Sequence, residues 1–177
     1  MRHPCIIVIA GPNGVGKSTF AEWYLKTVDD CSCYIDPDAI AREVASDEAL
    51  NAQVLAARIV LQRFDELVQL RQSFAIESTL SGKSLAQRLR QASDMGYYIA
   101  IIILWVPSVR VTIERVAIRA ASGGHDIPLM DQLRRFDRSY TNFFSLYRKL
   151  SHEWRLYYGV PQPPEEIATG SGRSIEE

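Results

Sequence analysis

The sequence predicts an α/β fold in which a central, mostly parallel five-stranded sheet carries helices on both faces. Short apolar, β-branched segments alternate along the chain with longer segments of helical periodicity. The first apolar segment, residues 5–10, leads directly into a glycine-rich turn and a helix. The 177 residues, 47% hydrophobic and 23% charged, suit one globular domain of ordinary size.

Apolar runs and helix-breaking residues place the elements of the first half of the chain. They are strands at residues 5–10 and 33–35 and helices at residues 17–28, 39–45 and 48–71. The first strand is a continuous β-branched run, which is typical of a strand buried on both faces of a parallel sheet. The long helix has one apolar stripe, formed by Val54, Ala57, Leu61, Phe64, Leu67 and Val68.

The second half continues this alternation. It contains strands at residues 73–77, 99–105 and 155–158 and helices at residues 84–95, 109–121 and 129–150. Right-handed crossovers between parallel strands place ligands at the carboxyl ends of those strands. We expect one domain over residues 1–158, with a lid at about 109–150. A C-terminal tail would cover residues 159–177, with one short edge strand at Ile167-Ala168.

Charge and cysteine content exclude several classes of protein. Lys and Arg number 20 and Asp and Glu number 21, a balance that argues against a nucleic acid partner. Residues 1–10 are too short in their charged and apolar parts to suit a signal peptide, and no apolar run reaches the roughly 20 residues that would cross a membrane, so we expect a cytoplasmic protein. The cysteines Cys5, Cys31 and Cys33 form no paired framework and are expected to be reduced.

The strongest motif lies between the first strand and the first helix. Residues 11–19 (GPNGVGKST) fit G-x-x-x-x-G-K-[ST] in the strand–turn–helix context that this motif requires. Glycines let backbone N–H groups surround an anion, and the helix N-terminus adds partial positive charge. The residues expected to hold a nucleotide are Gly11, Asn13, Gly14, Val15, Gly16, Lys17, Ser18 and Thr19. Lys17 should reach the β- and γ-phosphates, Ser18 should bind Mg²⁺, and Thr19 should contact the α-phosphate.

This motif predicts a three-layer P-loop NTPase or kinase fold with a helical lid. The absence of other motifs excludes several classes of NTPase. The N-K-x-D and D-x-x-G strings of GTPases occur nowhere in the chain. The apolar strand at 99–105 ends in Trp-Val-Pro, whereas a motor or transporter ATPase would end it in Asp-Glu to hold Mg²⁺ and activate water. A small phosphotransferase remains, in which a substrate hydroxyl accepts the phosphoryl group.

Such an enzyme needs a carboxylate near the γ-phosphate to orient and deprotonate the acceptor. Asp36 and Asp38 follow the second strand at the right edge of the sheet, although Asp38 would equally suit the cap of the next helix. Glu77 and Thr79 follow the third strand. A charged residue closing an apolar strand indicates a role in binding substrate or Mg²⁺, while Thr79 has helix capping as its alternative.

Arginines in the last third of the chain are candidates to neutralise the transferred phosphoryl group. Arg115 and Arg119 share one face of a helix. A second cluster consists of Arg134, Arg135 and Arg138. Solvated surface is the ordinary alternative for each of these arginines. The pair Gly123-Gly124 between the two helices is the expected hinge of the lid.

Four segments, in this order, resemble the zeta toxin family of P-loop kinases. They are residues 8–20 (VIAGPNGVGKSTF), 35–41 (IDPDAIA), 74–82 (FAIESTLSG) and 123–128 (GGHDIP), the last leading to 134–139 (RRFDRS). The resemblance covers most of the chain, from the first strand to about Tyr158. It implies ATP as donor with Mg²⁺, and, in toxin members, phosphorylation of the 3′-hydroxyl on the sugar of UDP-N-acetylglucosamine. An antitoxin protein is a candidate partner.

The resemblance assigns roles to individual residues. It makes Lys17 and Ser18 the contacts of ATP and Mg²⁺ and Asp38 the general base. Arg115 and Arg119 match the two arginines that clamp the transferred phosphate, with Arg134 or Arg135 as alternatives to Arg119. The expected substrate-binding residues are Asp36, Glu77, Thr79, Arg134 and Arg135. Asp36 stands where the family usually has Asn, and the chain is shorter than full-length toxins, so phosphoryl transfer carries over better than substrate identity.

We therefore expect a Mg-ATP-dependent kinase that phosphorylates a hydroxyl of a small molecule, with UDP-N-acetylglucosamine as one candidate. Two alternatives stay open. One is a nucleotide-binding module, or a toxin–antitoxin component, that acts through partner binding. The other is a nucleotide or polynucleotide kinase. The candidate base and the arginines favour a kinase, because binding alone needs neither.

Overall fold

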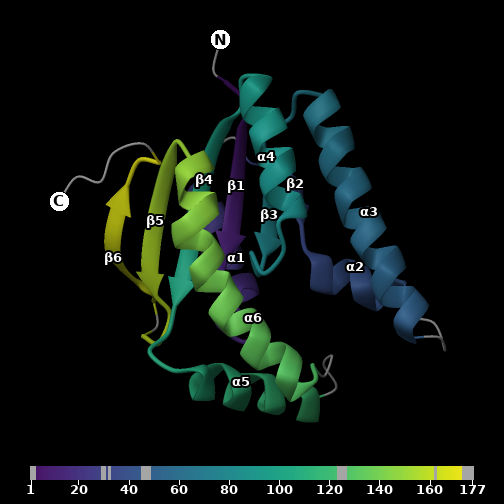
Figure 1. Ribbon diagram of the computed structural model, residues 1–177, viewed down its shortest axis with the longest axis vertical. Coiled ribbons are helices and arrows are strands. Elements are labelled where there is room, and N and C mark those ends of the chain that lie inside the picture. The colour runs from purple at the N-terminus through teal and green to yellow at the C-terminus, as the bar shows by residue number, and fades with distance from the viewer. Residues whose placement is uncertain are drawn as a thin grey trace.

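The computed structural model describes residues 3–28, 31, 33–44, 49–122, 127–161 and 163–172. They form one six-stranded sheet with the strand order β2-β3-β1-β4-β5-β6 and helices on both faces (Figure 1). The predicted α/β class is confirmed. The expected lid hinge, Gly123-Gly124, lies outside the described residues.

Five strands are parallel and correspond to those expected from the sequence. They are β1 (Cys5–Ala10), β2 (Cys33–Ile35), β3 (Phe74–Ser78), β4 (Tyr98–Trp105) and β5 (Glu153–Tyr158). β1 lies between β3 and β4, with Val8 opposite Ile76 on one side and Ile101 on the other. All three residues are at most 2% exposed, which explains the unbroken apolar sequence of these strands.

β6 (Glu165–Gly170) pairs antiparallel with β5 and makes the sheet one strand larger than predicted. It is also longer than the expected Ile167-Ala168 pair. The hydroxyl of Tyr157 donates to Glu166 at 2.8 Å across the two strands. The sequence indicates only the Ile167-Ala168 part of this strand, because the Glu and Gly residues at its ends are of types depleted in strands. The domain boundary predicted at residue 158 falls between these two paired strands.

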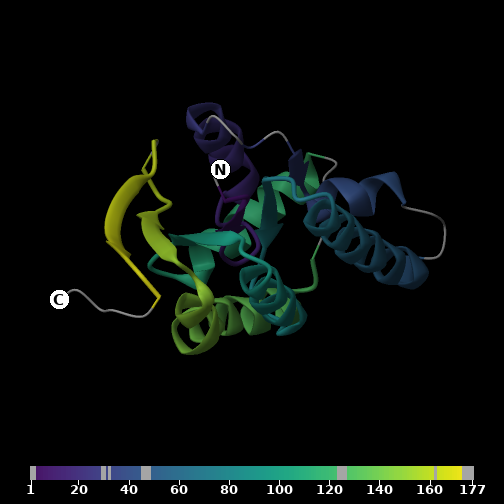
Figure 2. The same ribbon diagram turned by 90° about the horizontal axis from the view of Figure 1, so that it is seen from above.

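The helices are α1 (Lys17–Tyr24), α2 (Pro37–Glu43), α3 (Ala49–Gln69), α4 (Ser84–Asp94), α5 (Val109–Ala121) and α6 (Leu129–Asn142). Figure 2 shows α1 on one side of the sheet and α4 and α6 on the other. One core, around Val8 and Phe74, packs under α3 and α4. The other, around Ile9 and Phe20, packs under α1. No described helix is long and apolar enough to cross a membrane.

Two expected helices change their winding before they end. The helix expected over residues 17–28 becomes a 3₁₀ turn, Leu25–Thr27, after α1. The helix expected over residues 129–150 continues from α6 into a π-helical turn, η2 (Phe143–Tyr147), and a 3₁₀ turn, Arg148–Leu150. Hydrophobic periodicity does not distinguish these windings, because the periods of α-, 3₁₀- and π-helices differ too little over a single turn.

Only the second half of the apolar stripe on α3 joins the core. Phe64, Leu67 and Val68 are buried, whereas Val54 is 50% exposed. Ala57, also near the start of the helix, is exposed as well. The first half of the stripe therefore remains available to line a cleft.

Candidate active site

The turn after β1 has the backbone expected of a phosphate loop. Gly14 has φ +76° and Gly16 has φ +104°, values that favour glycine. A Cβ on Gly14 would collide with the Thr112 carbonyl oxygen, so α5 packs directly against the loop there. A Cβ on Gly16 would meet only the Arg115 guanidinium, 4.0 Å away. Gly16, Ser18 and Thr19 are exposed, as anion-binding groups must be.

Lys17 folds back over the loop. Its Nζ donates a hydrogen bond to the Pro12 carbonyl oxygen at 3.1 Å. Burial lowers the pKa of Lys17, and the nearby carboxylates of Glu77 and Asp38 oppose that shift. The ammonium therefore stands in a partly desolvated position beside the loop, where a phosphate oxygen would compensate its charge.

Glu77, at the end of β3, is only 4% exposed. Burial raises the pKa of Glu77, while Lys17 and hydrogen bonds from Tyr34 and Ser18 oppose that shift. The Tyr34 hydroxyl donates to Oε1 of Glu77 from β2. Tyr34 is not among the site residues expected from the sequence. The strand register contains the signal, because Tyr34 lies opposite Ala75, two residues before Glu77 on the same face.

These residues suit Mg²⁺, which binds through one or two protein oxygens while phosphate oxygens and water complete its coordination. The hydroxyl of Ser18 lies on an exposed residue at the start of α1. The carboxylate of Glu77 is held next to it. A hydroxyl and a carboxylate supply the hard oxygen donors that this ion prefers, so the donor chemistry present fits the metal expected from the motif.

Asp36, not Asp38, caps α2. Its Oδ1 accepts hydrogen bonds from the N–H groups of Asp38, at 2.8 Å, and Ala39, at 3.1 Å. Pro37 occupies the first helical position, so the helix begins two residues before the predicted start. The alternative that Asp38 is the cap is therefore wrong. The Asp38 carboxylate instead pairs with Arg119 of α5, with 3.2 Å between Oδ2 and Nη1.

Four of the predicted arginines lie in four different environments. Arg119 pairs with Asp38, and Arg134 pairs with Asp131 of its own helix at 2.7 Å. Arg135 reaches the phosphate loop, where its Nη1 donates to Oδ1 of Asn13 at 3.4 Å. Arg115 donates to the carbonyl oxygens of Val15 and Gly159, each at 3.1 Å. Arg119 and Arg135 thus approach the loop region from two different helices.

Thr79 lies in the loop that follows β3, where its hydroxyl is 2.8 Å from that of Ser81. Ser78 accepts a hydrogen bond from the N–H of Leu80. Neither caps α4, whose N-cap is Lys83 without a side-chain hydrogen bond. The capping alternative for Thr79 is therefore wrong.

Two clefts meet beside the loop. The loop cleft, of about 270 Å³, runs along the phosphate loop between Ser18 and Arg119. The large cleft, of about 600 Å³, has Thr79 and a charged wall from α6, opposite an apolar wall from α2 and α3. The charged wall consists of Asp131, Arg134, Arg135 and Arg138, and the apolar wall of Ala41, Ala56, Ala57, Val60 and Leu61. The residues common to both clefts are Asn13, Lys17, Asp38 and Glu77.

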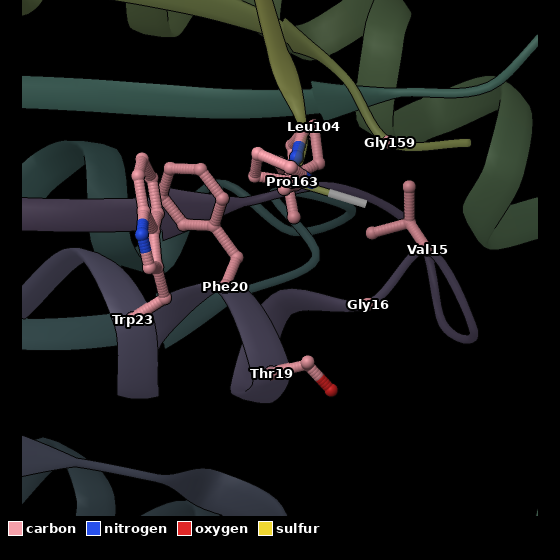
Figure 3. A pocket seen from close by; sticks show the side chains of 9 residues that line it. Val15, Gly16, Thr19, Phe20, Trp23, Leu104, Gly159 and Pro163 are labelled. Atoms are coloured by element: carbon pink, nitrogen blue, oxygen red, sulfur yellow. The ribbon is translucent and has the colours of Figure 1, made fainter. Parts of the chain in front are cut away.

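A third, mostly apolar pocket of about 180 Å³ adjoins the loop from the side of α1. Figure 3 shows Phe20 and Trp23 extending from α1 toward Leu104 and Pro163. Gly16 and Thr19 also line this pocket. This pocket is not expected from the sequence, because Pro163 belongs to the segment expected to be a tail.

Comparisons with known proteins agree with this fold. A family model described as "AAA domain" matches residues 6–142. An uncharacterized protein of Haemophilus influenzae is 32% identical over 121 residues, which cover 68% of this chain and 84% of that protein.

The solved structures that are similar in fold include the following two. One comes from the PezAT chromosomal toxin–antitoxin system of Streptococcus pneumoniae, with a TM-score of 0.70, 14% identity, and coverage of 96% of this chain and 72% of that chain. The other is shikimate kinase from Acinetobacter baumannii in complex with shikimate, with a TM-score of 0.53, 16% identity, and coverage of 85% and 82%. At these identities the likeness concerns the fold alone.

Proposed function

The chain belongs to the AAA domain family and has a kinase-like P-loop domain, and from this premise we propose that it is a Mg-ATP-dependent phosphotransferase. In this proposal it transfers the γ-phosphoryl group of ATP to a hydroxyl of a small molecule. The meeting of the loop cleft and the large cleft supports the proposal most strongly. A donor in one cleft and an acceptor in the other would face each other at Asn13, Lys17, Asp38 and Glu77.

The donor side follows from the loop. Backbone N–H groups of the loop, among them those of Gly14 and Gly16, and the ammonium of Lys17 hold the β- and γ-phosphates. Ser18, with Glu77 beside it, would hold Mg²⁺, which supplies positive charge to the phosphate oxygens. The apolar pocket around Phe20 and Trp23 takes the nucleotide base. This pocket adjoins Thr19, and its mostly apolar lining suits the faces of a planar base.

The transfer itself uses Asp38 as the general base. The acceptor hydroxyl gives its proton to the Asp38 carboxylate while its oxygen forms a bond to the γ-phosphorus. The bond between that phosphorus and the β–γ bridging oxygen breaks, and ADP leaves. Arg119 and Arg135 neutralise the charge on the transferred group. Asp36, by capping α2, holds Asp38 in place.

The acceptor side is the large cleft. Thr79 and Arg134, two of the expected substrate-binding residues, line this cleft. The resemblance to zeta toxins makes UDP-N-acetylglucosamine the first acceptor to test and an antitoxin protein the first partner to seek. The shared fold with a chain of the PezAT toxin–antitoxin system supports this order of testing. A nucleotide or polynucleotide kinase, and a nucleotide-binding module without transfer, are the alternatives.

ADP release in the presence of UDP-sugars, nucleosides, sugar alcohols and oligonucleotide ends tests the proposal. We expect one acceptor class to stimulate release, and Asp38→Asn to lower the stimulated kcat about a hundredfold or more while ATP still binds. Asp94→Asn, at the exposed end of α4, is the matched control and should behave as wild type. Binding of ATP without stimulation by any acceptor would favour the nucleotide-binding module.

A further inference from the structure

Arg115 has a contact pattern that a phosphate clamp does not need. Its Nη1 donates to the carbonyl oxygens of Val15 and Gly159, and its Nη2 donates to Gly159 as well, all at 3.1 Å. Both acceptors are backbone atoms, and Val15 belongs to the phosphate loop. A planar fork of fixed N–H groups is well suited to bridge two such oxygens, whereas a single ammonium is not.

The contact with Val15 bears directly on the loop's ability to bind an anion. In a planar trans peptide the C=O and N–H groups point in opposite directions. Arg115 fixes the carbonyl oxygen of Val15 on its own side, so the N–H of Gly16 in the same peptide points away from Arg115. The peptide unit is otherwise easy to rotate, because Gly16 has no side chain and a left-handed backbone.

The contact with Gly159 fastens the same peptide to the sheet. The Gly159 N–H donates to the Trp105 carbonyl oxygen at 2.8 Å, which fixes this residue at the ends of β4 and β5. A Cβ on Gly159 would lie 3.3 Å from the Val15 carbonyl oxygen, so the two backbones are in close approach. Arg115 therefore joins α5, the phosphate loop and the end of the sheet at one point.

We propose that Arg115 is a positioning residue that holds the phosphate loop in its nucleotide-binding conformation, and that it is not one of the arginines that clamp the transferred phosphoryl group. This proposal rests on the proposed function, since it assumes that the loop binds a nucleotide. It assigns the clamp to Arg119 and Arg135, whose guanidinium groups lie beside Asp38 and Asn13.

The two roles differ in their effect on ADP. A residue that holds the loop in shape strengthens the binding of every nucleotide that carries a β-phosphate. A clamp on the γ-phosphoryl group strengthens the binding of the triphosphate alone. We expect Arg115→Lys to weaken binding of ADP and of the ATP analogue AMP-PNP by the same factor, about tenfold, as measured by isothermal titration calorimetry with Mg²⁺. Lysine keeps the charge but lacks the planar fork, so this variant tests the bridging geometry of Arg115 and not its charge.

Three further variants complete the experiment. Arg110→Lys changes an exposed arginine of the same helix and should bind both nucleotides as wild type does. Arg119→Lys should weaken AMP-PNP more than ADP. Gly159→Ala brings a Cβ to 3.3 Å from the Val15 carbonyl oxygen and should weaken both nucleotides, which keeps the test open if Arg115→Lys does not fold. A binding stoichiometry near one identifies the folded variants.

The outcomes separate this inference from the function on which it rests. If wild-type protein binds neither nucleotide, the proposed function fails. If wild type binds both but Arg115→Lys weakens AMP-PNP alone, or weakens neither, the positioning role is overturned and the function stands. Unchanged ADP binding by Gly159→Ala would overturn it as well.

Discussion

At the scale of single residues, Lys17 shows the conflict between stability and binding most directly. Burial lowers its pKa even though the carboxylates of Glu77 and Asp38 attract the charge. The folded environment thus disfavours the ammonium as a whole. Such groups persist where function requires them, and replacing them is a common way to stabilise a protein.

Replacing Lys17 with Met should therefore stabilise the ligand-free protein while it weakens nucleotide binding. Met keeps most of the apolar stem, and the Pro12 carbonyl oxygen retains a hydrogen bond from the N–H of Val15. We expect the free energy of unfolding to rise by about 1 kcal/mol and the affinity for Mg-ATP to fall tenfold or more. Chemical denaturation and calorimetry measure the two effects. A variant that binds Mg-ATP as tightly as wild type would contradict the phosphate loop assignment.

The residue types after the second strand identify the candidate carboxylates, but they do not show which carboxylate caps the helix. The pair Asp36 and Asp38 was identified from the sequence, but which of them caps the helix depends on where the helix begins. Pro37 decides this, because proline is favoured at the first helical position and places the cap at Asp36. The Tyr34 contact to Glu77 required the register of β2 and β3, which no local pattern contains.

At the scale of elements, the π-helical turn after α6 holds the loop that follows β3. Asn142 donates to the Leu80 carbonyl oxygen at 2.7 Å, and the Tyr147 hydroxyl donates to that of Gly82 at 2.7 Å. Five residues separate these side chains, which would place them about 140° apart on an α-helix. The wider π turn brings them closer to one face, and both reach the same loop.

The loop needs this support because Leu80 has φ +53°, a left-handed backbone that is strained for leucine, while its side chain is 1% exposed. We expect Asn142→Leu to lower the free energy of unfolding by about 1–2 kcal/mol and to speed amide hydrogen exchange in residues 78–83. Thr141→Ala, on the neighbouring exposed residue, should change neither. Equal exchange in wild type and Asn142→Leu would mean that the loop is held by other contacts.

The windings at the ends of the predicted helices explain why this support was not foreseen. The apolar periodicity of residues 129–150 fits one continuous helix, and it places the boundaries of the helical segment well. The change from α to π winding at Phe143 depends on packing against the sheet, where Phe143 and Tyr147 are both fully buried. That packing is a tertiary effect, and a single segment does not contain it.

At the scale of the whole molecule, the candidate site lies at one edge of the sheet, where helices from both faces reach the ends of the strands. β1, β2 and β3 end at one edge of the sheet, and α1, α2, α5 and α6 bring Ser18, Asp38, Arg119 and Arg135 to it. The sequence predicted this edge from the order of strands and helices alone. It did not predict that residues in the first half of α3, such as Ala57 and Val60, would form a wall of the large cleft.

The last strand provides a test of the chain's domain organisation. A boundary at residue 158 would make residues 159–177 a dispensable tail, whereas the sheet places β6 along the edge of β5. Trp154 and Tyr157 of β5 are 8% and 6% exposed. A Cβ on Gly170 of β6 would lie 2.7 Å from the Trp154 indole, so the two strands are in close contact. Pro163, between them, lines the apolar pocket.

Removing residues 161–177 should therefore destabilise the protein by about 2 kcal/mol or more, because the partly uncovered Trp154 and Tyr157 side chains regain contact with water. The open edge of β5 should also pair with other copies, so we expect concentration-dependent association. Thermal unfolding and sedimentation velocity measure both effects, with a truncation of residues 173–177 as the control that keeps β6. Because the apolar pocket would lose Pro163, the longer truncation should weaken Mg-ATP binding too. A truncated protein that stays monomeric, melts with the control and binds Mg-ATP equally well would instead establish residue 158 as the end of the domain.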